Sequence, residues 1–276
     1  EKILCDYWLD DGSFLKIDTM PNGKTDINNQ GAFSTDIIGR NYDYPDGSLE
    51  TRARIRAETL RYTHGLLHFL GHDPRIPAAV RSSMLAWGLC RDEFQDTGGW
   101  PHQLYVREAR RMVSSYVMTE LNCRGLARAP HSVGLGSYNM DSHNVQRVVQ
   151  GGVARNEGDT QVGVPGPYPI AYASIVPAPA ECANLLVTFC LSATHIAFGS
   201  IRMEPVLMVL SQSAATAAAF AIDDAVPIQQ VDPEKLSLLL LADGQVLGWG
   251  AAPVDPGDGI MADSEDPSAQ VVGTWP

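Results

Sequence analysis

The sequence has few basic residues for its length. Among 276 residues, 20 are Lys or Arg and 32 are Asp or Glu, which gives a formal net charge of −12. Surfaces that neutralise phosphates need clustered positive charge, so nucleic acid is excluded as a main partner. Charged residues make up only 19% of the chain and hydrophobic residues 45%. This balance permits a large core and excludes disorder as the main state, and the length predicts one large domain or two modest ones.

Paired cysteines and an uninterrupted apolar run of membrane length are also missing. The five cysteines never form a Cys-x-x-Cys pair, so neither a disulfide scaffold nor a zinc ribbon is indicated. The longest apolar stretch, residues 205–222, carries Ser211, Gln212 and Ser213 near its middle. A membrane span would be apolar there, so we expect no membrane partner. The sequence leaves the oligomeric state and the cellular compartment open.

Turn residues and apolar spacing predict a mixed α/β (α+β) fold. Short apolar pieces between Gly, Asp, Asn and Pro predict strands and loops in residues 1–50 and 130–182. Helical patterns predict helices over residues 48–70, 77–89, 104–120, 205–222 and 232–244. The apolar residues 185–189 predict a buried strand, followed by a loop over residues 192–199.

The predicted strand, loop and helix from Asn184 onward form the most informative stretch. In open α/β sheets, ligands bind where strand ends meet helix N-termini. Free amides and the helix dipole there favour an anion or an electron-rich carbonyl. Gly199 would permit close approach of the backbone, and Arg202 would add positive charge. A reduced flavin suits such a place, although an ordinary capped turn between a strand and a helix has the same local pattern.

Several motifs together resemble the FAD-dependent oxidoreductases, and in particular the branch often labelled xanthan lyase-like. They are CLSATH at residues 190–195, GSIRMEP at 199–205, QSAA at 212–215, WPHQLYVREARR at 100–111 and YNMDSH at 138–143. Shorter matches at residues 24–29, 168–170 and 174–177 keep the same order along the chain. The set spans most of residues 24–236.

The resemblance implies a two-part FAD-binding domain with an inserted, mixed substrate domain. Residues 1–183 would be the substrate-domain region, residues 184–250 the closing part of the FAD-binding domain, and residues 251–276 a linker into an accessory module. FAD would be the cofactor, held by His195, Gly199, Ser200, Ile201, Arg202 and Met203. The implied catalytic residues are His143, His195, Tyr138 and Arg107, and the implied substrate-binding residues are His102, Tyr105 and Arg147.

The family's glycine-rich turn for the cofactor diphosphate is not found in the sequence. Gly134-Leu135-Gly136 lacks the third glycine of Gly-x-Gly-x-x-Gly and does not open a helical pattern. Most of the binding energy for FAD would come from diphosphate and ribose contacts. The sequence therefore suggests either a portion of a longer enzyme or a shortened relative that holds flavin weakly.

Two other constellations have alternative explanations. His64, His68 and His72 are spaced four residues apart, which suits a metal on one helix face, but a chance run on a partly exposed helix is the favoured explanation, and we expect no metal. Ser137 or Ser142 with His143 and Asp141 contains the residue types of a hydrolase triad. Neighbours in sequence seldom align as nucleophile, base and orienting carboxylate, however.

Three functions remain open from the sequence. The leading hypothesis is hydride transfer between an organic substrate, with saccharides as one candidate class, and flavin, with His143 or His195 as the base. The second is a flavin-free lyase or hydrolase acting on an acidic polysaccharide, in which Tyr138 and His143 abstract a proton and Arg107 neutralises a carboxylate. The third is a glycan-binding or structural module without catalysis.

Overall fold

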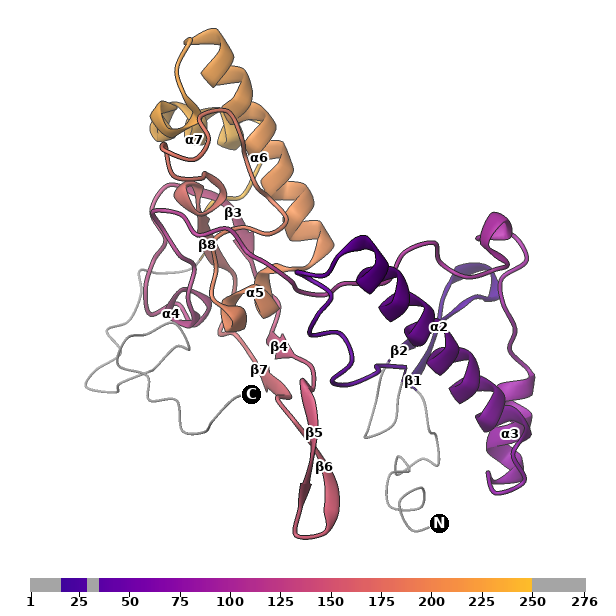
Figure 1. Ribbon diagram of the computed structural model, residues 1–276. Coiled ribbons are helices and arrows are strands. Elements are labelled where there is room, and N and C mark those ends of the chain that lie inside the picture. The colour runs from indigo at the N-terminus through magenta and orange to yellow at the C-terminus, as the bar shows by residue number, and fades with distance from the viewer. Residues whose placement is uncertain (1–15, 29–34, 250–276) are drawn as a thin grey trace. The chain divides into compact units, whose positions relative to one another are not determined.

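The computed structural model describes residues 16–28 and 35–249, and the chain forms two compact units (Figure 1). Unit 1 contains residues 1–106 and 144–158, and unit 2 contains residues 107–143 and 159–276. Helices and small antiparallel sheets occur together, which confirms the predicted mixed class. The predicted boundary at residue 183 separates a substrate domain from an FAD-binding part by function, and it stays a prediction. The predicted linker, residues 251–276, lies outside the described residues.

Unit 1 is built around the long helix α2 (Leu49–His72). The Ser48 side chain caps its first turn by accepting a hydrogen bond from the Thr51 N–H at 3.2 Å. The helix ends before Pro74 because the residue preceding proline avoids the helical conformation. At that end the Asp73 carboxylate accepts hydrogen bonds from Arg75, which lower the pKa of Asp73 to about 2.

The apolar core of unit 1 is small among the described residues. Helix α3 (Ala78–Leu85) packs against α2, and Leu70 and Ile76 are the fully buried centre of this contact. Strands β1 (Lys16–Thr19) and β2 (Thr25–Asn28) form an antiparallel hairpin, which contributes the partly buried Ile17 and Ile27 to the same cluster.

A second hairpin of unit 1 joins β5 (Gln146–Gln150) to β6 (Val153–Glu157). Gly151 and Gly152 form its two-residue turn with φ values of 60° and 76°. This left-handed conformation at both positions matches the twist of the strands and favours glycine. Arg147, on β5, donates from Nε to Asn156 Oδ1 on β6 at 3.0 Å.

Unit 2 holds a large apolar core under helix α6 (Glu204–Asp223), as the 24 buried residues of its hydrophobic cluster show. Helix α6 lies against β3 (Ser132–Gly136), which pairs with β8 (Tyr168–Ala171) (Figure 1). A Cβ at Gly134 would lie 3.1 Å from Val209 and 3.2 Å from Leu210, so glycine permits this close approach. Helix α7 (Pro233–Ala242) packs on α6 and begins at Asp232, whose side chain accepts from the Glu234 and Lys235 amides.

Length and apolar composition alone would let α6 cross a membrane, since it is the one helix among the described residues that passes this test. Core helices of soluble proteins pass the same test. The packing of α6 on β3 and the hydrogen bond from Ser213 Oγ to the Val133 carbonyl, at 2.6 Å, place one face of the helix against the core of unit 2. The predicted start of this helix near residue 205 is confirmed, and Pro205 lies in its first turn.

The predicted helix over residues 104–120 is wrong. Only the short α4 (Glu120–Cys123) is helical there, and the preceding segment is irregular or extended. Its backbone instead bonds to residues 190–194: Met112 N–H donates to the Cys190 carbonyl, Met118 N–H to Ser192, and Thr194 N–H to Met118. These long-range bonds replace the helical ladder, and the apolar spacing alone does not reveal them.

The predicted strand at residues 185–189 and the loop at 192–199 also need correction. The first segment forms no strand, and one backbone bond, from Val187 N–H to the Ile175 carbonyl, ties it to the core. The second segment contains the start of helix α5 (His195–Ile201), where the Thr194 side chain accepts from the Ala197 amide. A threonine cap therefore begins a helix where the sequence predicted a loop.

Candidate active site

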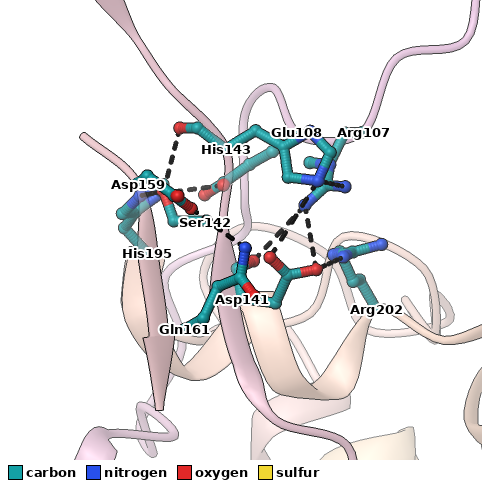
Figure 2. A network of polar contacts seen from close by, with 9 residues as sticks. All are labelled: Arg107, Glu108, Asp141, Ser142, His143, Asp159, Gln161, His195 and Arg202. Carbon is teal, nitrogen blue, oxygen red and sulfur yellow. Dashed lines mark hydrogen bonds and ion pairs between the residues drawn. The ribbon is translucent and has the colours of Figure 1, made fainter. Parts of the chain in front are cut away.

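Four segments of unit 2 bring their polar side chains together, and one of them, residues 159–161, supplies Asp159 and Gln161 (Figure 2). The extended segment after residue 106 supplies Arg107 and Glu108, strand β4 (Met140–Ser142) and the next residue supply Asp141, Ser142 and His143, and α5 with its C-cap supplies His195 and Arg202. Strand β4 pairs with β7 (Thr160–Val162).

Gly199 lets α5 lie directly on β4. A Cβ built at Gly199 would be 2.8 Å from the Asp141 carbonyl oxygen, a distance that real Cβ atoms essentially never show. Any larger residue would push the helix away from the strand. The position of His195 and Arg202 relative to β4 therefore depends on this glycine.

One carboxylate lies between two guanidinium groups in this site. Asp141 Oδ2 is 2.8 Å from Arg202 Nη2 and 3.5 Å from Arg107 Nη1, and the exposed fractions of the Asp141 and Arg202 side chains are 12% and 10%. These three groups alone sum to one positive charge, and the cluster also contains the carboxylates Glu108 and Asp159. Among the described residues, no hydrogen-bond partner is found for the buried atoms Asp141 Oδ1 and Arg202 Nε.

The ring of His143 accepts a hydrogen bond from Arg107. Arg107 Nη2 lies 2.6 Å from His143 Nε2. Because a guanidinium only donates, Nε2 must accept, and this contact requires an imidazole that carries no proton on Nε2. The lone pair that would make His143 a base is therefore already engaged.

His195 lies between a carboxylate and a hydroxyl. Its Nδ1 is 2.8 Å from Glu108 Oε2, and its Nε2 is 3.2 Å from Ser142 Oγ. An acidic partner on Nδ1 holds the proton there and leaves Nε2 as the acceptor. Glu108 is itself fixed by an ion pair with Arg111, whose Nε donates to the Ala193 carbonyl at 2.7 Å.

The residues predicted to hold flavin divide into two groups. Gly199, Ser200 and Ile201 are buried. Ser200 Oγ accepts a hydrogen bond from the Tyr168 hydroxyl at 2.6 Å and donates to the Tyr138 carbonyl. Burial raises the pKa of Tyr168 above its ordinary range. These three residues therefore support the site from the interior, whereas His195, Arg202 and Met203 remain partly exposed.

Two amide N–H groups in the first turn of α6 are hydrogen-bonded to the backbone of its N-cap residue. Met203 is the N-cap residue, and its carbonyl accepts from the Val206 and Leu207 N–H groups. Met203 makes no side-chain capping bond, and Glu204 is exposed in the first turn. The helix tip is not covered by a capping side chain, and Arg202 directly before it belongs to the polar cluster.

The predicted substrate-binding residues lie in unit 1, and the predicted catalytic residue Tyr138 lies in unit 2. Tyr138 is exposed in unit 2, with the Arg202 guanidinium carbon 5.8 Å from its ring centroid. His102 and Tyr105 are exposed in unit 1, and Arg147 is on the β5–β6 hairpin of that unit. Their assignment to substrate binding stays a prediction.

The three histidines considered for a metal have other contacts. The His64 ring lies 4.1 Å from the Trp100 ring, and the His68 and His72 rings stack at 4.2 Å. Within residues 16–28 and 35–249, no group of three or more His, Cys, Asp or Glu side chains is arranged to hold a metal.

The sequence did not identify Glu108 or Ser142 as partners of His195. Glu108 entered only as part of the motif at residues 100–111, and Ser142 was considered only with its neighbours His143 and Asp141. The contacts in the structure join residues 53 and 87 positions apart, so local spacing carries no signal for them.

Comparison with known families identifies the chain. The family model described as FAD dependent oxidoreductase matches residues 6–240. The match covers most of the chain, which therefore belongs to the FAD-dependent oxidoreductase family. The comparisons gave no match among curated proteins or solved structures.

The polar cluster fits one end of the family's cofactor. The flavin ring presents carbonyl oxygens and ring nitrogens that accept hydrogen bonds and gain negative charge on reduction. The Arg202 Nε, for which no hydrogen-bond partner is found among the described residues, and the two guanidinium groups on Asp141 suit such a group. In the parts of the chain that are described, no glycine-rich turn from strand to helix suits the diphosphate, because Gly134 and Gly136 lie inside β3.

Proposed function

We propose that this chain forms the substrate-side and ring-side part of a flavin oxidoreductase that acts on a hydroxyl-bearing organic compound, with saccharides as the first class to test. The family match supports flavin chemistry in general. FAD, when bound, would accept two electrons from the substrate as a hydride. The likeness of the CLSATH and GSIRMEP motifs to the xanthan lyase-like branch supports the saccharide part of the proposal.

The observation that carries the proposal is the contrast between the two histidines of the site. His143 Nε2 accepts from Arg107, whereas His195 Nε2 faces a neutral hydroxyl and Nδ1 faces Glu108. His195 is therefore the base that takes the substrate hydroxyl proton, at Nε2, with Ser142 beside it. The Arg107 guanidinium, held by His143, orients the substrate, and Arg202 holds the acceptor edge of the ring.

Flavin binding is tested on the purified chain by the quenching of flavin fluorescence, with FAD and riboflavin compared. If the ring end provides most of the contacts, the two flavins bind with similar affinity and Arg202→Gln weakens both. Arg124→Gln is the matched control, since Arg124 pairs with Glu120 at 3.1 Å and is outside the polar cluster. If neither FAD nor riboflavin binds to the unmodified chain, the proposal is contradicted.

Substrate oxidation is tested by loss of flavin absorbance when a panel of saccharides is added without oxygen. Removing a general base typically slows proton transfer by about 10²–10⁴-fold. We therefore expect His195→Gln to slow the bleaching by about 100-fold or more with little change in flavin affinity. If flavin absorbance is lost at the unmodified rate in this variant, His195 is not the base.

The flavin-free lyase would need His143 as a free base. The Arg107 contact on His143 Nε2 opposes this role, so the oxidoreductase is the better-supported proposal.

A further inference from the structure

We propose that Ser142, His195 and Glu108 form a nucleophile, base and orienting carboxylate, and that Ser142 can be acylated by small carboxylic esters. The three side chains have the linear order that such catalysis needs: Glu108 Oε2 to His195 Nδ1 at 2.8 Å, and His195 Nε2 to Ser142 Oγ at 3.2 Å (Figure 2). Both distances fall in or near the range for a competent nucleophile–base–orienter set. This activity requires no flavin.

The direction of each hydrogen bond follows from the partners. A carboxylate only accepts, so His195 donates to Glu108 from Nδ1. The lone pair of Nε2 then faces Ser142 Oγ, whose single hydrogen can turn to Nε2 at 3.2 Å or to the His143 carbonyl oxygen at 3.4 Å. This is the tautomer in which imidazole can remove a serine proton.

Each of the three groups is fixed by contacts of its own. Glu108 pairs with Arg111, which also binds the Ala193 carbonyl. His195 begins helix α5, which the Thr194 side chain caps and Gly199 seats against β4. Ser142 lies on β4 opposite Thr160 of β7. Such support limits the motion that would separate nucleophile and base.

The exposed fractions of the His195 and Ser142 side chains limit the size of the acyl group that can react. The His195 side chain is 44% exposed, which gives the leaving alcohol and water a route to Nε2. Ser142 is only 6% exposed, so a short acyl group is favoured over a long or branched one.

The reaction balances without a redox partner. Ser142 Oγ bonds to the ester carbonyl carbon as its proton moves to His195 Nε2. The carbon–oxygen bond to the alcohol then breaks, and the alcohol leaves with that proton. Water repeats the same sequence on the acyl-serine, which releases the carboxylic acid and restores Ser142.

The direct test is labelling of the full 276-residue chain by a small alkyl fluorophosphonate, followed by intact mass and fragment mass spectrometry. We expect one phosphonyl group, on Ser142. His195→Gln should lower the labelling rate by about 100-fold or more, and Glu108→Gln by a smaller factor. Ser137→Ala is the matched control, because Ser137 is an exposed serine five residues away that is outside the cluster.

Thermal unfolding of each variant separates loss of chemistry from loss of fold. Labelling of Ser142 that depends on His195 in folded variants supports the proposal. No label on the unmodified chain, a label on another serine, or an unchanged rate in folded His195→Gln would overturn it. Because the reaction mixture contains no flavin, each of these outcomes leaves the oxidoreductase proposal to its own test.

Discussion

The two units differ in how firmly they hold their polar side chains. In unit 2 the candidate active-site residues project from elements that pack on a core of 24 buried residues. In the described part of unit 1, the fully buried apolar side chains are Ile55, Leu70 and Ile76, although α2 alone has 24 residues. Ordered geometry for chemistry is therefore expected in unit 2, and adaptable surface contacts in unit 1.

Truncating one leucine in the long helix of each unit should affect the stability of unit 2 far more than that of unit 1. Leu210→Ala, at a fully buried position of α6, should reduce the free energy of unfolding by about 2–5 kcal/mol because it leaves a cavity. Leu60→Ala, at a position of α2 that is 41% exposed, should change it by no more than about 0.5 kcal/mol. Urea unfolding measures both, and equal losses would contradict the contrast.

Substituting alanine for one glycine in each unit should change the stability of the two units in opposite directions. Gly199→Ala should destabilise unit 2 by about 1–3 kcal/mol, since its Cβ would meet the Asp141 backbone. It should also slow labelling of Ser142. Gly65→Ala in α2 meets no atom within 4 Å and should stabilise the helix by about 0.5–1 kcal/mol. Thermal unfolding measures the signs, and a stabilising Gly199→Ala would show that α5 and β4 are not in close contact.

Alkaline pH should weaken unit 2 through Tyr172. Its hydroxyl donates to the Ile228 carbonyl at 2.7 Å, and burial raises its pKa from 10.0 to about 12. The folded state keeps this proton longer than the unfolded state does. The stabilisation is therefore complete below pH 10 and is lost as the pH rises toward about 12.

Urea unfolding between these pH values, compared with Tyr172→Phe, isolates this contribution. The variant should lose about 1 kcal/mol at neutral pH with its hydrogen bond, and its stability should then fall less steeply above pH 10. A slope unchanged by the substitution would show that Tyr172 is not protected by burial.

Local signals predicted the helices whose caps lie within a few residues. Ser48 before α2, Pro205 in α6 and Asp232 before α7 fix those elements without distant contacts. The segment 107–119 was predicted wrongly because its backbone partners lie near residues 190–194, some 80 positions away along the chain. Short-range periodicity cannot report such pairing.

The same distinction applies to the site. Arg107, His143, His195 and Arg202 were selected by resemblance, and the structure brings them into one cluster. The roles of the two histidines could not be separated from sequence. They depend on which distant side chain, Arg107 or Glu108, contacts each ring.

The position of the proton on the His195 ring decides whether Nε2 can act as the base of the site. In a chain labelled with ¹⁵N histidine, long-range ¹H–¹⁵N correlation spectra distinguish a proton on Nδ1 from one on Nε2, and the missing signals in His195→Gln assign the ring. The account predicts that neutral His195 carries its proton on Nδ1, toward Glu108, and that Glu108→Gln reduces this preference. A neutral ring with its proton on Nε2 would contradict it, because Ser142 would then face a donor instead of a base.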